Sequence, residues 1–131
     1  MTETKRIHVA VGVIENAEGE ILIARRREGQ HLAGLWEFPG GKLEKGEDAS
    51  EALCRELYEE LGVKPSVSSF QFAVDHRYSE KSVSLLIFHV TEFSGEPRGQ
   101  EGQEIRWVSR EGLCSYPFPD ANQKILAYLK Q

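Results

Sequence analysis

The sequence has few cysteines, no long apolar run and no excess of basic residues. Its two cysteines, Cys54 and Cys114, cannot build a disulfide framework, and we expect both to be small buried side chains with free thiols in a reducing compartment. No apolar stretch approaches the length of a membrane-spanning helix, and the polar residues 1–6 do not look like a signal peptide. These absences predict a cytoplasmic protein without a membrane partner.

The acidic balance of the chain bears on its partners. The formal net charge is −5, whereas binding a nucleic-acid strand calls for a basic face. A small anionic ligand is compatible with this charge if metal ions offset the acidic residues. The 131 residues, 40% of them hydrophobic, are enough for one core and predict a single domain, 1–131.

Strand patterns occur in both halves of the chain. Apolar residues alternate over 7–13 and recur at 21–24, and the turn signal at 16–19 between them predicts a hairpin over 7–25. Further β-rich runs lie at 67–74, 83–90 and 105–108, with a turn at 79–82 between the first two. Glycine-containing segments at 28–35 and 95–102 predict loops.

One long helix is predicted in mid-chain, over 49–61. Asp48 is a favourable N-cap, Glu51 completes a capping box, and Gly62 stands where a helix C-terminal glycine is expected. A shorter amphipathic helix follows Pro119 at the C-terminus, with its apolar side at Ile125, Leu126 and Leu129. Strands combined with two helices predict an α/β fold with a central mixed sheet.

The predicted mid-chain helix carries an acidic stripe. Glu56, Glu59 and Glu60 fall within an arc of roughly 100°. Such a stripe is often only a solvated surface, but carboxylates at this spacing are also suitable ligands for hard cations such as Mg2+. Gly40 and Gly41 permit a close approach of main-chain carbonyls to the same helix face, which favours the metal-binding interpretation.

Residues 41–63 then match a specific motif. They read Gly41, five residues, Glu47, seven residues, Arg55-Glu56-Leu57, one residue, Glu59-Glu60, one residue, Gly62-Val63. Every fixed position of the Nudix box, G-x5-E-x7-R-E-U-x-E-E-x-G-U with U aliphatic, is present. The chain therefore resembles the Nudix family of hydrolases, which makes a merely solvated stripe a poor explanation.

The resemblance implies an α/β/α sandwich and hydrolysis of nucleoside diphosphates linked to another group. It implies Mg2+ as cofactor, with Mn2+ as an alternative ion. The implied metal ligands are the carbonyl of Gly40 and the side chains of Glu56, Glu59, Glu60 and Glu101. The implied catalytic residues are Glu47, Arg55, Glu56, Glu60 and Glu101, with Arg55 orienting its neighbour and Glu56, Glu60 and Glu101 all candidates for the general base.

Outside the box, the chain resembles the MutT branch, which removes 8-oxo-dGTP from the nucleotide pool and so avoids mutation. The resemblance runs over nearly the whole length, including Glu37-Phe38-Pro39-Gly40-Gly41-Lys42, Glu101-Gly102-Gln103 and Phe118-Pro119. It implies hydrolysis of 8-oxo-dGTP to 8-oxo-dGMP and pyrophosphate, with a monomer as the default state. The implied substrate-binding residues are Arg26, His31, Glu37, Phe38, Pro39, Gly40 and Asn122, and apolar walls are expected from Ile7, Val9 and Val83.

Simpler interpretations exist for several of these residues. Arg26 alone could be a surface charge, His31 a loop residue, Phe38 plain core, and Asn122 a helix N-terminal residue. The segment 34–38 is also typical of relatives that prefer cytidine nucleotides, so a pyrimidine triphosphate pyrophosphohydrolase is an alternative. A non-catalytic binding module is a further alternative, although such modules typically lose the box carboxylates that this chain has.

Overall fold

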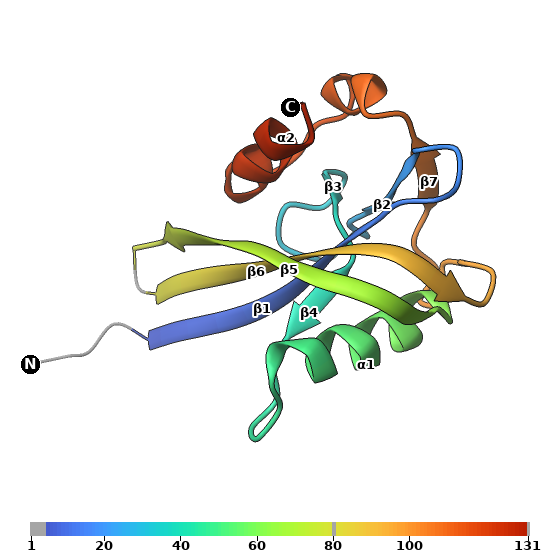
Figure 1. Cartoon of the computed structure of the whole chain (residues 1–131). Helices are drawn as coiled ribbons and strands as arrows, with labels where there is room; N and C mark the ends of the chain where they lie inside the picture. Colours follow the sequence, from blue (N-terminus) through green and yellow to red (C-terminus); the bar gives the residue numbers. More distant parts are fainter. Residues whose placement is uncertain (1–4, 80, 131) are drawn as a thin grey trace, which may run out of the picture.

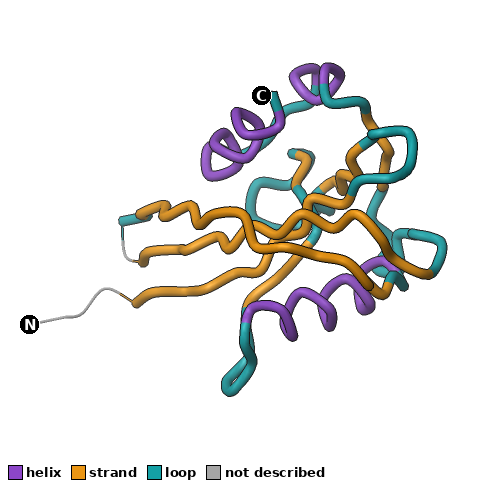
Figure 2. The backbone as a smooth tube through the Cα atoms, in the orientation of Figure 1, coloured by secondary structure: helices purple, strands orange, loops and turns teal. Residues whose placement is uncertain are grey.

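We analysed a computed structural model that describes residues 5–79 and 81–130. The alternation of apolar side chains produces a chain rich in strands, with one long helix between them (Figures 1 and 2). In chain order the elements are β1 (Lys5–Ile14), β2 (Ile21–Arg25), β3 (Trp36–Glu37), β4 (Gly40–Lys42), α1 (Ala49–Leu61), β5 (Lys64–Arg77), β6 (Lys81–Ser94), β7 (Ile105–Val108), the 3-10 helices η1 (Glu111–Ser115) and η2 (Asp120–Asn122), and α2 (Gln123–Leu129).

The strands form two sheets. The larger sheet has the order β4-β1-β6-β5 and is mixed, because β1 runs parallel to β6 and the other neighbours are antiparallel. The smaller antiparallel sheet has the order β3-β2-β7. The predicted central mixed sheet is confirmed. Within the described residues, no helix is long and apolar enough to cross a lipid bilayer.

The predicted hairpin over 7–25 is wrong. β1 and β2 belong to different sheets and share only an isolated bridge between Glu15 and Ile21. The reason is burial on both sides of β1: Val11 and Val13 face one core, whereas Ala10 and Ile14 face the other. A strand buried on both faces is suited to a central position, and β1 therefore lies between β4 and β6.

Two apolar cores lie on opposite faces of the larger sheet. One contains Leu53, Leu57 and Leu61 of α1, and the other contains Ile125 and Leu129 of α2. Figure 1 shows α1 on one side of β1, β5 and β6 and α2 on the other. The resulting helix–sheet–helix layering agrees with the expected α/β/α sandwich.

Helix α1 begins and ends as predicted. The Asp48 carboxylate accepts from the Glu51 N–H at 2.8 Å, and the Glu51 carboxylate accepts from the Asp48 N–H at 3.0 Å. At the other end Gly62 has φ 72°, a left-handed conformation in which its N–H reaches the Tyr58 carbonyl. The ends of the helix that carries the acidic stripe are thus fixed by local sequence.

Some local predictions differ from the structure. Cys54 and Cys114 are free, as predicted, but exposed rather than buried. Cys54 lies on the solvent side of α1, and the Cys114 thiol contacts the Glu111 carbonyl at 3.2 Å. β5 and β6 extend further than the predicted 67–74 and 83–90, and the predicted turn at 79–82 includes Glu80, which lies outside the described residues.

The capping box yields a stability prediction. Replacing Asp48 by Ala removes the acceptor for the Glu51 N–H, and we expect the free energy of unfolding to fall by about 1 kcal/mol. Asp48→Asn retains an oxygen acceptor and should stay within about 0.5 kcal/mol of the wild type. Urea unfolding at pH 7 measures both. Equal stability of the Ala and Asn variants would contradict a capping role for Asp48.

Candidate functional site

The site begins where β4 touches α1. A Cβ atom on Gly40 would lie 2.0 Å from the Ala10 carbonyl oxygen, and one on Gly41 would lie 2.3 Å from the carboxyl carbon of Glu56. Both distances are far below van der Waals contact, so only glycine fits at either position without displacing its neighbours. The two glycines therefore bring the main chain of β4 against the acidic side of α1, as the sequence predicted.

Glu60 is at the centre of this contact. Its carboxylate accepts from the Gly40 N–H at 3.2 Å. Burial raises the pKa of Glu60 to about 8, and the nearby charges of Glu56, Glu37 and Glu101 act in the same direction. The carboxylates of Glu37, Glu56 and Glu101, from β3, α1 and the loop after β6, thus lie around that of Glu60, which has no ion-pair partner of its own among the described residues.

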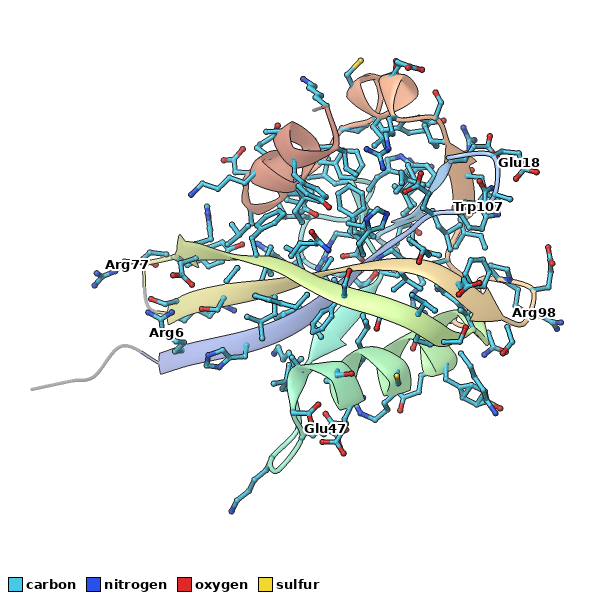
Figure 3. All side chains as sticks on the ribbon, in the orientation of Figure 1. Arg6, Glu18, Glu47, Arg77, Arg98 and Trp107 are labelled. Atoms are coloured by element: carbon cyan, nitrogen blue, oxygen red, sulfur yellow. The ribbon has the colours of Figure 1, made fainter. Side chains whose placement is uncertain are left out.

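Arg55 organises the outer side of the same helix. Its guanidinium donates to both Glu47 oxygens, at 2.7 and 2.9 Å, to Glu56 at 2.8 Å and to the Lys42 carbonyl at 3.0 Å. The hydrogen bonds from Arg55, assisted by the Glu44 N–H, lower the pKa of Glu47 to about 2. Figure 3 labels Glu47 in the segment that enters α1. The predicted contact between Arg55 and the glutamate beside it is present.

The third predicted helix carboxylate lies differently. The Glu59 side chain is 53% exposed and approaches Arg55 at 3.4 Å, whereas the Glu56 side chain is only 17% exposed. Glu59 is therefore on the solvent side of the stripe, and Glu56 and Glu60 face the β4 glycines. Sequence periodicity alone cannot distinguish these positions, because all three share one helical arc.

The loop between β6 and β7 closes the site over the end of α1. N–H groups of this loop donate to main-chain carbonyls in the last turn of the helix. The Arg98 N–H donates to the Leu61 carbonyl at 3.1 Å, and the Gln100 N–H donates to the Glu60 carbonyl at 3.0 Å. The Gln103 side-chain amide also donates to the Glu60 carbonyl, at 3.0 Å. Gln103 also accepts from the Glu101 N–H at 2.9 Å. This capping holds Glu101 beside Glu60, and both line one small pocket with Glu37.

A second pocket, of about 190 Å³, adjoins the carboxylates. Phe38 lies in its wall and stacks on Phe118, with ring centroids 5.2 Å apart. Arg26 forms an ion pair with Glu37 there. Burial raises the pKa of Glu37, although Arg26 opposes the shift. The pocket is lined by Val9, Val11, Arg26, His31, Leu32, Glu37, Phe38, Gly40, Tyr78, Val83, Leu85, Pro119, Ala121 and Asn122.

Most of the residues predicted to bind substrate therefore line one pocket. Pro39 is an exception: it is buried, and its carbonyl accepts from the Gly12 N–H at 2.8 Å. Ile7 also does not line the pocket. Asn122 occupies the N-cap position of α2, as the simpler interpretation has it, but its side chain makes no cap hydrogen bond and lines the pocket. Tyr78, which no sequence motif marks, also lines the pocket.

The donor set at the carboxylate cluster is suited to a hard divalent cation. Among residues 5–79 and 81–130, no three Asp, Glu, His or Cys side chains lie close enough together to hold a metal ion by themselves. Glu60 and Glu101 line one pocket, the Gly40 N–H reaches Glu60, and the Glu56 carboxyl lies against Gly41. Burial, and after it the charges of Glu56, Glu37 and Glu101, raises the pKa of Glu60, and a bound cation would offset the cost of ionising this carboxyl.

This arrangement agrees with comparisons to known proteins. The NUDIX domain model matches residues 10–128. The chain belongs to the Nudix family. A Nudix relative, the 8-oxo-dGTP diphosphatase of Escherichia coli K12, is 40% identical over 127 residues, covering 97% of this chain and 98% of the relative.

Two further comparisons place the chain within the family. The CTP pyrophosphohydrolase of Escherichia coli K12 is 38% identical over 122 residues, covering 93% and 91% of the two chains. A solved MutT structure, from a study of the Aliivibrio salmonicida and Vibrio cholerae proteins, has a TM-score of 0.84 and 37% identity over 95% of this chain and 97% of that one. The protein is a Nudix hydrolase of MutT type, and members of this family generally use divalent metal ions.

Glu60 yields a prediction on pH and stability without metal. Its carboxyl keeps a proton up to about pH 8 in the folded chain, against 4.5 as the ordinary value. The folded state binds more protons in this window, so stability falls as pH rises from about 4.5 through 8. The side chain of Glu60→Gln cannot ionise. Above about pH 8 the free energy of unfolding of this variant should therefore exceed that of the wild type, by on the order of 2 to 4 kcal/mol.

Urea unfolding in EDTA at pH 5 and pH 8.5 measures this difference. The Glu60→Gln advantage should be small at pH 5 and large at pH 8.5, and a saturating divalent cation should reduce it by stabilising the wild type. An advantage that is the same at both pH values would show that Glu60 ionises normally.

Proposed function

We propose that this Nudix hydrolase is a Mg2+-dependent nucleoside triphosphate pyrophosphohydrolase whose main substrate is 8-oxo-dGTP, which it converts with water to 8-oxo-dGMP and pyrophosphate. The observation that carries the proposal is the adjacency of the two pockets. Glu37 lines both the carboxylate pocket and the pocket that contains Asn122. A nucleotide with its base near Asn122 would therefore place its phosphates beside Glu60 and Glu101.

The chain's own residues divide the chemical work. Glu56, Glu60, Glu101 and the Gly40 carbonyl would hold Mg2+, with Glu59 available at the outer edge. Bound Mg2+ would neutralise phosphate oxygens and lower the pKa of an attacking water. Arg55 orients Glu56 and holds Glu47 ionised at the rim of the site. Glu56, Glu60 and Glu101 lie where one of them could accept the proton of the water.

The base pocket favours a ring with a polar edge. The Phe38–Phe118 stack and the side chains of Val9 and Val83 provide apolar walls for a flat base. Asn122 provides an amide that donates and accepts hydrogen bonds at once, which suits the mixed edge of an oxidised guanine. Arg26 and His31 lie at the same pocket and complete the substrate-binding set.

A pyrimidine triphosphate is the second candidate substrate. The observation in its favour is the 38% identity to a CTP pyrophosphohydrolase, close to the 40% identity to the 8-oxo-dGTP diphosphatase. The carboxylate site would act in the same way on either substrate, because both offer a triphosphate. The choice between them therefore depends on the base pocket alone.

We further propose a single-domain, monomeric enzyme of the cytoplasm that acts on free nucleotides. The net charge of −5 supports a small Mg2+-bound substrate rather than a nucleic-acid strand.

A panel of nucleoside triphosphates with pyrophosphate detection tests the function. With Mg2+, we expect 8-oxo-dGTP to be hydrolysed with a kcat/KM at least about tenfold above those of dGTP and CTP, since each base contact contributes of the order of 1 to 3 kcal/mol. Glu60→Gln should lose nearly all activity on every nucleotide. Equal rates on dGTP and 8-oxo-dGTP would count against the oxidised-guanine proposal, and preference for CTP would establish the second candidate.

Asn122→Ala tests base recognition separately. Removing the amide should lower kcat/KM for 8-oxo-dGTP by about 10- to 100-fold and reduce the discrimination against dGTP. Gln123→Ala, the neighbouring exposed residue, is the matched control and should change neither value. An Asn122→Ala enzyme with unchanged selectivity in the same panel would remove Asn122 from the base pocket's function.

A further inference from the structure

The end of β2 carries three consecutive arginines with different surroundings. Arg25 and Arg27 are exposed, whereas Arg26 is half-buried in the base pocket. Including Arg55, four arginines border the site, and three have carboxylate partners: Arg25 with Glu104 at 3.7 Å, Arg26 with Glu37, and Arg55 with Glu47 and Glu56. Within the described residues, Arg27 has no ion-pair partner. Its guanidinium donates to the main-chain carbonyl of Glu101, at 2.7 Å.

Arg27 also lies between two hollows. It lines the small carboxylate pocket together with Glu37, Glu60 and Glu101. It lines as well an open groove of about 610 Å³, whose other charged members are Arg25, Arg26, Glu28 and Glu104. The groove therefore adjoins the carboxylate pocket, and Arg27 is among the residues at their junction.

The three hollows adjoin one another. Glu37 is common to the base pocket and the carboxylate pocket, Arg26 to the base pocket and the groove, and Arg27, with Arg25 and Gln103, to the carboxylate pocket and the groove. If the base of a nucleotide occupied the base pocket, its inner phosphates would lie beside the carboxylate pocket. Its outermost phosphate would then reach the groove at Arg27.

Charge supports the same placement. The carboxylates can hold cations against the phosphates that lie beside them, but a phosphate beyond those carboxylates needs another positive group. A guanidinium presents two parallel N–H donors that match phosphate oxygens. The one site arginine without a carboxylate partner provides this charge at the entrance of the groove.

We propose that Arg27 binds the terminal phosphate of the substrate and so makes the groove a subsite that favours nucleoside triphosphates over shorter nucleotides. The proposal rests on the proposed nucleotide hydrolysis. It assigns Arg27 to binding, whereas the conversion itself depends on the carboxylates.

Binding measurements test this role apart from turnover. The probes are a dGTP analogue with a methylene group between the α- and β-phosphorus, which resists cleavage, and the monophosphate dGMP, both with Mg2+ in titration calorimetry. Arg27→Gln should raise the dissociation constant of the triphosphate analogue by about tenfold, as expected for a lost charge-assisted hydrogen bond. The dissociation constant of dGMP should change by no more than about twofold. Arg27→Lys, which retains a positive charge, should recover part of the loss.

Arg98→Gln is the matched control, because Arg98 is exposed in the loop after β6 and Figure 3 shows it at the outer edge of the molecule. It removes the same charge and should leave both dissociation constants unchanged. In turnover assays on the best substrate, Arg27→Gln should raise KM more than it lowers kcat. If Arg27 acted only by holding the Glu101 carbonyl, Arg27→Gln would instead lower kcat on every substrate and weaken the binding of dGMP as much as that of the triphosphate analogue.

The two proposals fail differently. If the wild type hydrolyses no nucleoside triphosphate, the proposed function fails. If the wild type is active but Arg27→Gln binds the analogue as the wild type does, or loses dGMP to the same extent, only the Arg27 proposal is overturned. Melting temperatures within about 2 °C of the wild type confirm that the variants are folded.

Discussion

The contact between the β4 glycines and α1 is the constraint on which the site depends. Gly40 fits against the Ala10 carbonyl and Gly41 against the Glu56 carboxyl only because neither has a Cβ atom. This contact places a main-chain N–H on Glu60 and leaves Glu56 facing β4. Every other component of the site is arranged around these two carboxylates: Arg55 holds one from outside, and the loop after β6 brings Glu101 to the other.

The electrostatics of the site follow from this crowding. Glu47 and Glu60 lie on the same acidic segment, yet their pKa values move in opposite directions, to about 2 and about 8. Glu47 accepts two hydrogen bonds from a guanidinium, whereas Glu60 is buried among like charges. The folded chain therefore stores unfavourable charge at one position, and cation binding would relieve it. In the proposed metal-dependent enzyme, this arrangement would lower stability without the ion and favour its binding.

Sequence reasoning succeeded where the cause is local and failed where it is not. The bounds of α1 were predictable because Asp48, Glu51 and Gly62 fix both ends through neighbouring atoms. The pairing of β1 with β6 was not, because it joins residues more than 70 positions apart, such as Ile7 and Val83. Tyr78 and Arg27 were missed as site residues for the same reason: their positions result from how distant strands and loops meet, and no motif marks them.

The loop from Gly95 to Glu104 serves two elements at once, since its amides complete the last turn of α1 while its Glu101 side chain enters the site. Such a connection tolerates little change in length. An inserted or deleted residue would put the amides out of step with the helix carbonyls or carry the carboxylate away from Glu60. Surface loops usually accommodate insertions easily, so within this chain variation in size is expected at the 16–19 turn rather than here.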